Sequence, residues 1–147
     1  MCIRDRFLNS SGGIEADVTV TRLSETAYLV VTPAATRLAD ETWMRRHVGD
    51  RNVMITDVTA SEGVLAVMGP NARKLMQAVS HNDFTNDVNP FGTAQEIEIG
   101  MGLARVHRVS YVGELGWEIY VGADQAGHIF ETLWDCLLYT SPSPRDS

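Results

Sequence analysis

Two scarcities limit what this chain can be. It contains only two cysteines, Cys2 and Cys136, which lie near opposite ends of the 147 residues. Two cysteines so far apart give no disulfide framework, so a reducing compartment such as the cytoplasm is expected. The chain also lacks an apolar run long enough to span a bilayer and a signal-peptide layout at its N-terminus. The sequence therefore predicts no membrane partner.

Basic residues are also few. The chain has 12 Lys and Arg against 19 Asp and Glu, which gives a net charge of −7. The adjacent basic pairs are Arg45-Arg46 and Arg73-Lys74, and the other basic residues are scattered. An acidic surface repels a phosphate backbone, so nucleic acid is not expected as a partner.

The motifs of several common enzyme classes are missing. There is no Walker loop, and Gly100-Met101-Gly102 lacks the third glycine of a dinucleotide-binding fingerprint. No serine has the context of a nucleophile elbow. No pair of His or Cys residues has metal-ligand spacing, so no metal site is expected. The four histidines are interpreted as structural or solvated residues; they are His47, His81, His107 and His128.

The chain does have enough apolar material for one domain, since 44% of its residues are hydrophobic. Its composition changes abruptly at both ends. Residues 1–6 have no periodicity, and residues 136–147 end in a Ser-Pro-Ser-Pro tract that cannot continue a helix. Both ends resemble translated adapter sequence. We predict non-native or disordered tails at 1–6 and 136–147 that pack on nothing, and one truncated domain at 7–135.

Hydrophobic periodicity predicts an α+β domain. Residues 14–23 alternate between apolar and polar side chains, which is typical of a half-buried strand. Further strands are predicted at residues 28–31, 53–58, 63–68, 96–99, 103–111 and 117–121, and helices at 33–48, 70–79 and 126–135. The strands come in pairs with short turns, so a mainly antiparallel sheet with about three helices is expected. The first helix is predicted to bury Ala35, Leu38, Ala39, Thr42 and Trp43.

Three polar residues lie in predicted strands beside glycine turns. Asp17 follows Gly12-Gly13 on the polar face of its strand, and Tyr111 is predicted to end a strand. Glu118 begins the next strand, and we expect it to face a cleft. On spacing alone, each of the three is better explained as an ordinary surface residue. The opposite face of the strand that holds Glu118 is predicted to enter the core with Trp117, Ile119 and Val121.

Three segments in order resemble one known family. Residues 8–17, LNSSGGIEAD, are similar to the LNxxGGIxxD segment of the aminomethyltransferase (glycine cleavage T-protein) folate-binding family. Residues 108–119, RVSYVGELGWEI, resemble the family's RxxYxGExGxE signature, and residues 65–70, LAVMGP, resemble its strand-Gly-Pro-helix segment. Some members have two adjacent acids near the double glycine, where this chain has Ala16 before Asp17. The three segments are spread between residues 8 and 119, so the resemblance extends over nearly all of residues 7–135.

The resemblance implies a T-protein-like folate-binding fold and assigns site residues. It gives Asp17 as the catalytic carboxylate, and Asn9, Tyr111 and Glu118 as residues that bind tetrahydrofolate. A reduced pterin presents an amino group and a ring N–H side by side, and the carboxylate of Glu118 is able to accept both. Tyr111 would cover the ring face, and Asp17 would orient the reacting amines. Asp17, Tyr111 and Glu118 are therefore expected to converge on one ligand.

Two further segments, residues 15–23 and 90–100, resemble the C-terminal folate domain of FAD-dependent dimethylglycine and sarcosine dehydrogenases. This implies capture of a one-carbon unit from an N-methyl amine iminium to give 5,10-methylenetetrahydrofolate. FAD would be bound by a missing upstream domain fused to this one, and this piece alone would be inactive. Two alternatives stay open. One is the glycine cleavage T-protein, and the other is a folate-binding module without transfer chemistry.

Overall fold

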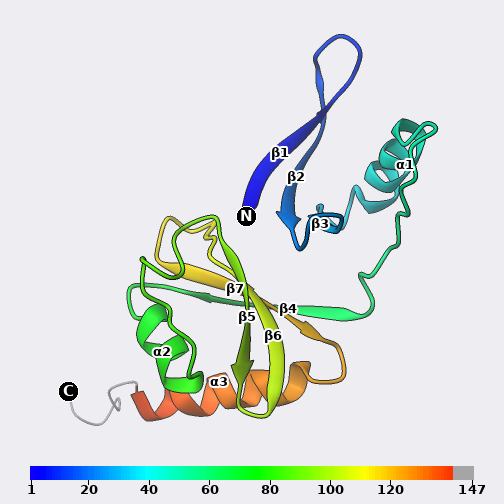
Figure 1. The fold of residues 1–147 in the computed structure, drawn as a ribbon. Helices are drawn as coiled ribbons and strands as arrows, with labels where there is room; N and C mark the ends of the chain where they lie inside the picture. Colours follow the sequence, from blue (N-terminus) through cyan, green and yellow to red (C-terminus); the bar gives the residue numbers. More distant parts are fainter. Residues whose placement is uncertain (141–147) are drawn as a thin grey trace. The chain divides into compact units, whose positions relative to one another are not determined.

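The computed structural model describes residues 1–140 and divides into two compact units (Figure 1). Unit 1 is Met1–Asp57, and unit 2 begins at Val58. Each unit has its own antiparallel sheet, and the described residues contain three helices. The α+β class and the mainly antiparallel pairing predicted from the sequence are therefore confirmed. We expected one domain over residues 7–135, and the structure divides this stretch after Asp57.

Unit 1 consists of a three-stranded sheet followed by a helix. The strands are β1 (Cys2–Leu8), β2 (Ile14–Arg22) and β3 (Tyr28–Val31), and the helix is α1 (Arg37–His47). The central strand is β2, which pairs antiparallel with both β1 and β3. Its alternation buries Ala16 and Val18, as the period of two predicts, but Thr19 and Thr21 are buried as well.

The N-terminal residues do not form the unstructured tail that we predicted. Cys2 to Leu8 pair with β2 along their whole length, and Cys2 is buried opposite Thr21. The pairing is long-range, because the partner strand lies beyond a turn, so the composition of residues 1–6 alone did not reveal it. The prediction that these residues pack on nothing was wrong, whereas their non-native origin stays a prediction.

The predicted inner face of α1 is also corrected. Leu38 is 69% exposed, whereas Asp40 is buried. The carboxyl group of Asp40 accepts hydrogen bonds from the hydroxyls of Thr32 and Thr36, which supply partners for its oxygen where water is excluded. Trp43 packs as expected, since it stacks on Phe7 of β1 with ring centroids 4.3 Å apart. The helix is therefore anchored to its sheet by an aromatic stack and a buried acid.

The segment after α1 differs from the sequence prediction too. We expected a strand at residues 53–58, but no strand occurs between α1 and Glu62. Met54 is 90% exposed, and Val53 and Val58 are also exposed. A run of β-branched residues forms a strand only where a partner supplies the ladder, and within the described residues none pairs with this run.

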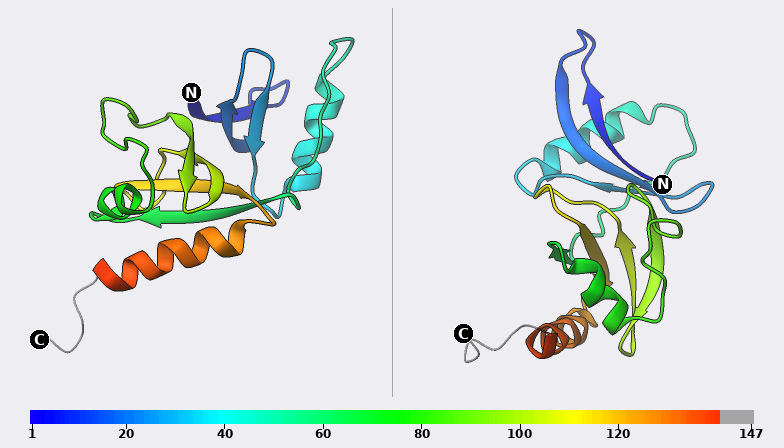
Figure 2. Two further views of the ribbon diagram at one scale, coloured as in Figure 1. Left: turned by 60° about the horizontal axis from the view of Figure 1, so that its bottom comes forward. Right: turned by 90° about the vertical axis from the view of Figure 1, so that its left-hand side faces the viewer.

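Unit 2 is a four-stranded antiparallel sheet with two helices (Figure 2). Its sheet has the order β4-β7-β6-β5. Gly69-Pro70 ends the first strand and leads into the first helix, as the sequence predicts. The elements are β4 (Glu62–Met68), α2 (Ala72–Val79), β5 (Ala94–Ile99), β6 (Gly102–His107), β7 (Gly116–Gly122) and α3 (Ala126–Thr140).

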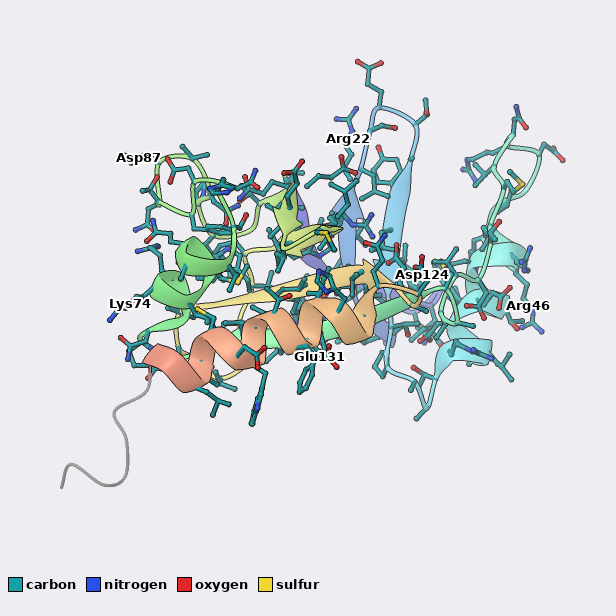
Figure 3. All side chains as sticks on the ribbon, turned by 90° about the horizontal axis from the view of Figure 1, so that it is seen from below. Arg22, Arg46, Lys74, Asp87, Asp124 and Glu131 are labelled. Carbon is teal, nitrogen blue, oxygen red and sulfur yellow. The ribbon has the colours of Figure 1, made fainter. Side chains whose placement is uncertain are left out.

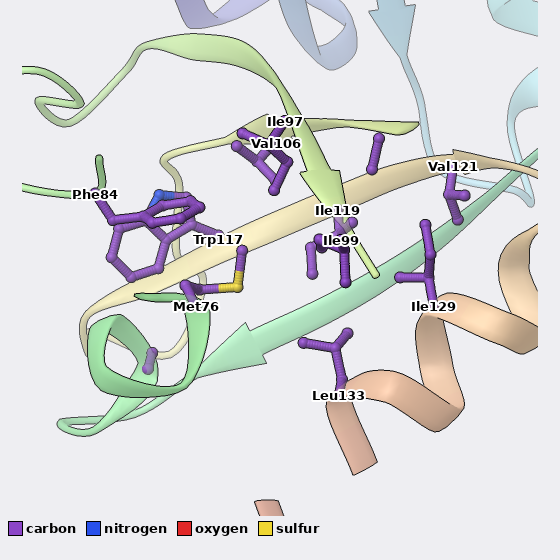
Figure 4. Close-up of a cluster of buried hydrophobic side chains, with 12 residues drawn as sticks. Met76, Phe84, Ile97, Ile99, Val106, Trp117, Ile119, Val121, Ile129 and Leu133 are labelled. Carbon is purple, nitrogen blue, oxygen red and sulfur yellow. The ribbon is translucent and has the colours of Figure 1, made fainter. Parts of the chain in front are cut away.

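The core of unit 2 lies between the sheet and its two helices (Figure 4). Met76 of α2 and Ile129 of α3 are fully buried against sheet residues such as Ile119. Trp117, Ile119 and Val121 all have exposed fractions of 2% or less, which confirms the predicted alternation of β7. The other face of β7 carries Glu118, so the sheet separates the core from the candidate site.

Helix α3 extends beyond the predicted boundary at residue 135. It runs to Thr140, so the predicted tail does not begin at Cys136. The spacing of Ile129, Leu133 and Leu137 continues one apolar stripe, and no proline occurs between the start of the helix at Ala126 and Pro142. Residues 141–147, where the remainder of the tail prediction falls, lie outside the described residues.

Charged side chains lie mainly on the surface of both units. The six that Figure 3 labels are all exposed. Within the described residues, no helix is long and apolar enough to cross a membrane. The labelled residues are Arg22, Arg46, Lys74, Asp87, Asp124 and Glu131.

Candidate functional site

Asn9 organises the turn between β1 and β2. Its side-chain oxygen accepts the backbone N–H groups of Ser11 at 3.0 Å and Gly13 at 2.8 Å, and its amide donates to Glu15 at 3.0 Å. Gly12 supplies the positive φ of 79° that this turn requires. Asn9 is exposed, and its contacts are those of a turn-forming residue. Its role in folate binding stays a prediction.

Asp17 lies on β2 and forms an ion pair with Arg4 of β1. The Nε of Arg4 donates to both carboxylate oxygens, at 2.8 and 3.1 Å, and the terminal nitrogen donates as well. The hydrogen bonds from Arg4 hold the pKa of Asp17 below its ordinary value. The carboxylate is therefore ionised at neutral pH, and in this chain the guanidinium of Arg4 is its partner in an ion pair.

Glu118 lies on the face of the unit 2 sheet opposite the helices. It is half-buried, and its Oε2 accepts a hydrogen bond of 2.7 Å from the hydroxyl of Tyr120. Residues i and i+2 of a strand share a face, so the two side chains lie side by side along β7. A carboxylate has about four lone-pair sites, and one such bond leaves the others for a ligand.

Two residues of the neighbouring strand β6 contact the ring of Tyr120. The ring of His107 stacks on it with centroids 4.3 Å apart, and the Cζ of Arg105 lies 5.8 Å from its centroid. Arg105 is in turn held by Glu62, whose two carboxylate oxygens each lie 3.0 Å from the same nitrogen. The face opposite the core therefore carries a continuous row of polar and aromatic contacts across β4, β6 and β7.

His107 is neutral in this row. It is fully buried, and burial together with the nearby positive charge of Arg105 lowers its pKa to about 4. A neutral imidazole ring stacks on Tyr120 without bringing a second cation beside Arg105. The sequence prediction of a structural role for His107 agrees with this environment.

Tyr111 lies outside any strand. We predicted that it ends a strand, but β6 stops at His107 and Tyr111 is 66% exposed in the loop before β7. The pairing of β6 with both neighbours ends at His107, opposite Ala94 and Glu118. The strand boundary is corrected, and the role of Tyr111 as a cover for the pterin ring stays a prediction.

A cavity of about 600 Å³ lies elsewhere in unit 2. It is bounded by β4, the start of α2 and the face of α3 that carries Phe130, Trp134 and Leu137. Its lining is mostly apolar, and Glu118 and Tyr111 do not contribute to it. The cleft that we predicted at Glu118 therefore stays a prediction.

The predicted site residues are divided between the units. Asn9 and Asp17 belong to unit 1, and Tyr111 and Glu118 belong to unit 2. Their convergence on one ligand stays a prediction. The sequence analysis missed Arg4 because it assigned residues 1–6 to a tail. It also missed Tyr120, although the i, i+2 spacing from Glu118 placed both on one strand face.

Three comparisons with known proteins bear on the site. The family model described as the GCVT N-terminal domain matches residues 3–136. A 4-methylaminobutanoate oxidase (formaldehyde-forming) from Paenarthrobacter nicotinovorans is 37% identical over 129 residues, which are 88% of this chain and 16% of the relative. An aminomethyltransferase from Listeria welshimeri is 36% identical over 124 residues, which are 84% of this chain and 33% of the relative.

Human mitochondrial dimethylglycine dehydrogenase is 30% identical over 129 residues, 86% of this chain and 15% of the relative. The chain thus spans a third or less of the length of these relatives, each of which is named as an enzyme. Among solved structures, the heterotetrameric sarcosine oxidase from Corynebacterium sp. U-96 matches with a TM-score of 0.73 and 18% identity, over 86% of this chain and 62% of that chain. At that identity the match supports the fold.

Proposed function

Since this chain belongs to the GCVT N-terminal domain family, we propose that its full-length protein captures a one-carbon unit from an N-methyl amine on tetrahydrofolate. The observation that carries the proposal is the carboxylate of Glu118. It lies directly after the signature turn, is half-buried, and is held by Tyr120 on the face opposite the core. The product would be 5,10-methylenetetrahydrofolate.

The contacts of Glu118 fit a pterin. Tetrahydrofolate, when bound, supplies the amine nitrogens that take up the one-carbon unit. Glu118 has one oxygen bonded to Tyr120 and, within the described residues, no hydrogen bond at the other, so its carboxylate is able to accept two neighbouring N–H groups. Hydrogen bonds to an ionised acceptor are about twice as strong as neutral ones, which suits an anchoring role. Tyr111, in the same unit, would cover the ring.

Asp17 would act at the reacting end of the ligand. Its ionised carboxylate would stabilise the positive charge of an iminium and accept a proton from a folate amine. Asn9 would bind the ligand from the turn that precedes this strand.

The names of the relatives favour a methylamine substrate. Human dimethylglycine dehydrogenase and the bacterial 4-methylaminobutanoate oxidase both act, by name, on amines that carry a methyl group. We propose that the full-length protein likewise has a fused flavin domain, which binds FAD and oxidises the amine to the iminium. Residues 1–147 alone would then not catalyse the reaction.

The alternative is a glycine cleavage aminomethyltransferase. It is favoured by the match to the Listeria aminomethyltransferase, which is 36% identical to this chain, close to the 37% of the 4-methylaminobutanoate oxidase. The two functions differ in the donor of the one-carbon unit. The full-length protein would be given dimethylglycine, sarcosine or 4-methylaminobutanoate in one assay, and an aminomethyl-lipoyl carrier in the other. Methylenetetrahydrofolate formed only from the carrier would replace our proposal with this alternative.

The central test is the removal of the Glu118 carboxylate. In the full-length protein, Glu118→Ala should weaken tetrahydrofolate binding by about 1.5–3 kcal/mol, the usual scale for a hydrogen bond to a charged group. Binding would be measured by anaerobic titration. Glu131→Ala, which removes an exposed glutamate of α3, is the matched control and should bind like the parent. A Glu118→Ala variant with unchanged affinity would show that this residue is not the pterin acceptor.

A further inference from the structure

Tyr120 is placed to control the orientation of Glu118. Tyr120 is 5% exposed, and its hydroxyl donates a hydrogen bond of 2.7 Å to Oε2 of Glu118 on the same strand face. A glutamate on a strand has three rotatable side-chain bonds, so its carboxylate samples several directions unless a neighbour fixes it. A donor that is itself immobile removes that freedom before a ligand arrives.

The surroundings of Tyr120 keep it immobile. His107 stacks on the ring at 4.3 Å with an interplanar angle of 29°, and Arg105 lies over the ring with its Cζ 5.8 Å from the centroid. Glu62 holds Arg105 through both of its carboxylate oxygens. Both ring contacts come from β6, and Glu62 of β4, on the other side of β7, holds Arg105 in place. The hydroxyl therefore projects from a rigid support toward the carboxylate.

We propose that Tyr120 is a positioning residue for the folate site: it holds one oxygen of Glu118 so that the other faces the pterin N–H groups. The inference rests on the proposed function, since it requires Glu118 to be the pterin acceptor. Tyr120 does not touch the ligand and acts through Glu118 alone. Preorganised acceptors bind more tightly because less side-chain freedom is lost on binding.

The test is a double-mutant cycle in the full-length protein, with tetrahydrofolate as the titrant. Tyr120→Phe removes only the hydroxyl and keeps the ring between His107 and Arg105, so the sheet should fold normally. We expect it to raise the Kd about tenfold, the usual scale for one hydrogen bond to a charged group. In the Glu118→Ala background, Tyr120→Phe should cause no further loss. Tyr28→Phe, which removes an exposed hydroxyl of β3, is the matched control.

Three results would overturn the inference, and they are distinguishable. If Glu118→Ala weakens binding but Tyr120→Phe does not, Glu118 is the acceptor and Tyr120 does not position it. If the losses of the two single variants add in the double variant, Tyr120 acts on binding through general stability and not through Glu118. If Glu118→Ala itself binds folate like the parent, the proposed acceptor and the positioning role both fail. Thermal unfolding of each variant confirms that the compared proteins are folded.

Discussion

At the scale of single residues, the ion pair between Arg4 and Asp17 stabilises the ionised form of the Asp17 carboxylate in this chain. Arg4 contacts both oxygens of the carboxylate and lowers its pKa, so the acid is ionised at neutral pH. An ionised carboxylate stabilises a cationic iminium, whereas a protonated one does not. In this chain, an arriving cation would compete with Arg4 for the carboxylate of Asp17.

Replacement of Asp17 by asparagine tests this role. In the full-length protein, Asp17→Asn keeps the size of the side chain but removes its charge, so folate binding should stay within about threefold while capture of the one-carbon unit slows roughly 100-fold. The uncaptured carbon would leave as formaldehyde, which is measured during amine oxidation. Glu25→Gln, an exposed acid in the turn before β3, is the control. Normal capture by Asp17→Asn would remove this residue from the mechanism.

His107 should make the free energy of unfolding fall as the pH is lowered. Its folded pKa of about 4 lies below the ordinary value of 6.5, so the unfolded chain takes up the proton first as the pH falls. The contribution of neutral His107 is complete above pH 6.5 and is lost as the pH falls toward about 4. Between pH 7 and pH 4, we expect the free energy of unfolding to fall by about 3 kcal/mol from this residue.

Urea unfolding of the chain at several pH values would measure the loss. His107→Phe keeps an aromatic ring against Tyr120 but does not titrate, so the parent should lose more stability than this variant over the same pH interval. Subtraction of the variant's curve removes the contribution of the carboxylates. Identical curves for the two proteins would contradict the assignment of the pH dependence to His107.

At the scale of strands and helices, local patterns predicted the interior well and the ends poorly. The alternation of β7 correctly placed Trp117 and Ile119 in the core, because a strand between two others must bury one face. Residues 1–6 carry no such pattern, and their strand exists only because β2 offers a ladder. The predicted end of α3 at residue 135 was too early, because residues 136–140 were assigned to the same tail as the Ser-Pro tract, whereas the helix runs to Thr140.

Prediction of the candidate site from the sequence had the same limits. The face of Glu118 was predictable from the period of two, but its bond to Tyr120 depends on the side-chain rotamers. The stack of His107 on Tyr120 depends on the register of β6 against β7, which pairs Arg105 with Tyr120 and His107 with Glu118. Register is set by contacts between distant segments, so a pattern within one segment does not contain it. Resemblance supplied Asn9 and the role of Asp17, because spacing alone did not distinguish Asp17 from an ordinary surface residue.

Helix α3 should be anchored by its buried face alone. Ile129 is fully buried in the core cluster, whereas the neighbouring Phe130 is 50% exposed and stacks mainly on Trp134 of the same helix. Ile129→Ala should therefore lower the free energy of unfolding by about 2–5 kcal/mol. Phe130→Ala should lower it by about 1 kcal/mol or less. Equal losses in urea unfolding would mean that α3 packs through a different face.

At the scale of the whole molecule, the two units differ in how much apolar surface they bury. All twelve residues of the main core cluster lie in unit 2, between Ala72 and Leu133. The buried apolar side chains of unit 1 are Cys2, Ala16 and Val18. Burial of apolar side chains is the main favourable contribution to folding. Unit 2 should consequently be the more stable of the two, which matters because Asp17 and Glu118 belong to different units.

Hydrogen exchange on the chain of 147 residues would measure this difference. Val106 and Val20 are matched positions, since each lies in a strand paired on both sides. The amides of Val106 and its strand β6 should exchange on the order of 100-fold more slowly than those of Val20 and β2, because the small core of unit 1 opens at lower free energy. Equal exchange rates would mean that the chain opens as one cooperative body. In that case the apolar core of unit 2 would protect the strand that holds Asp17 as well as the strand that holds Glu118.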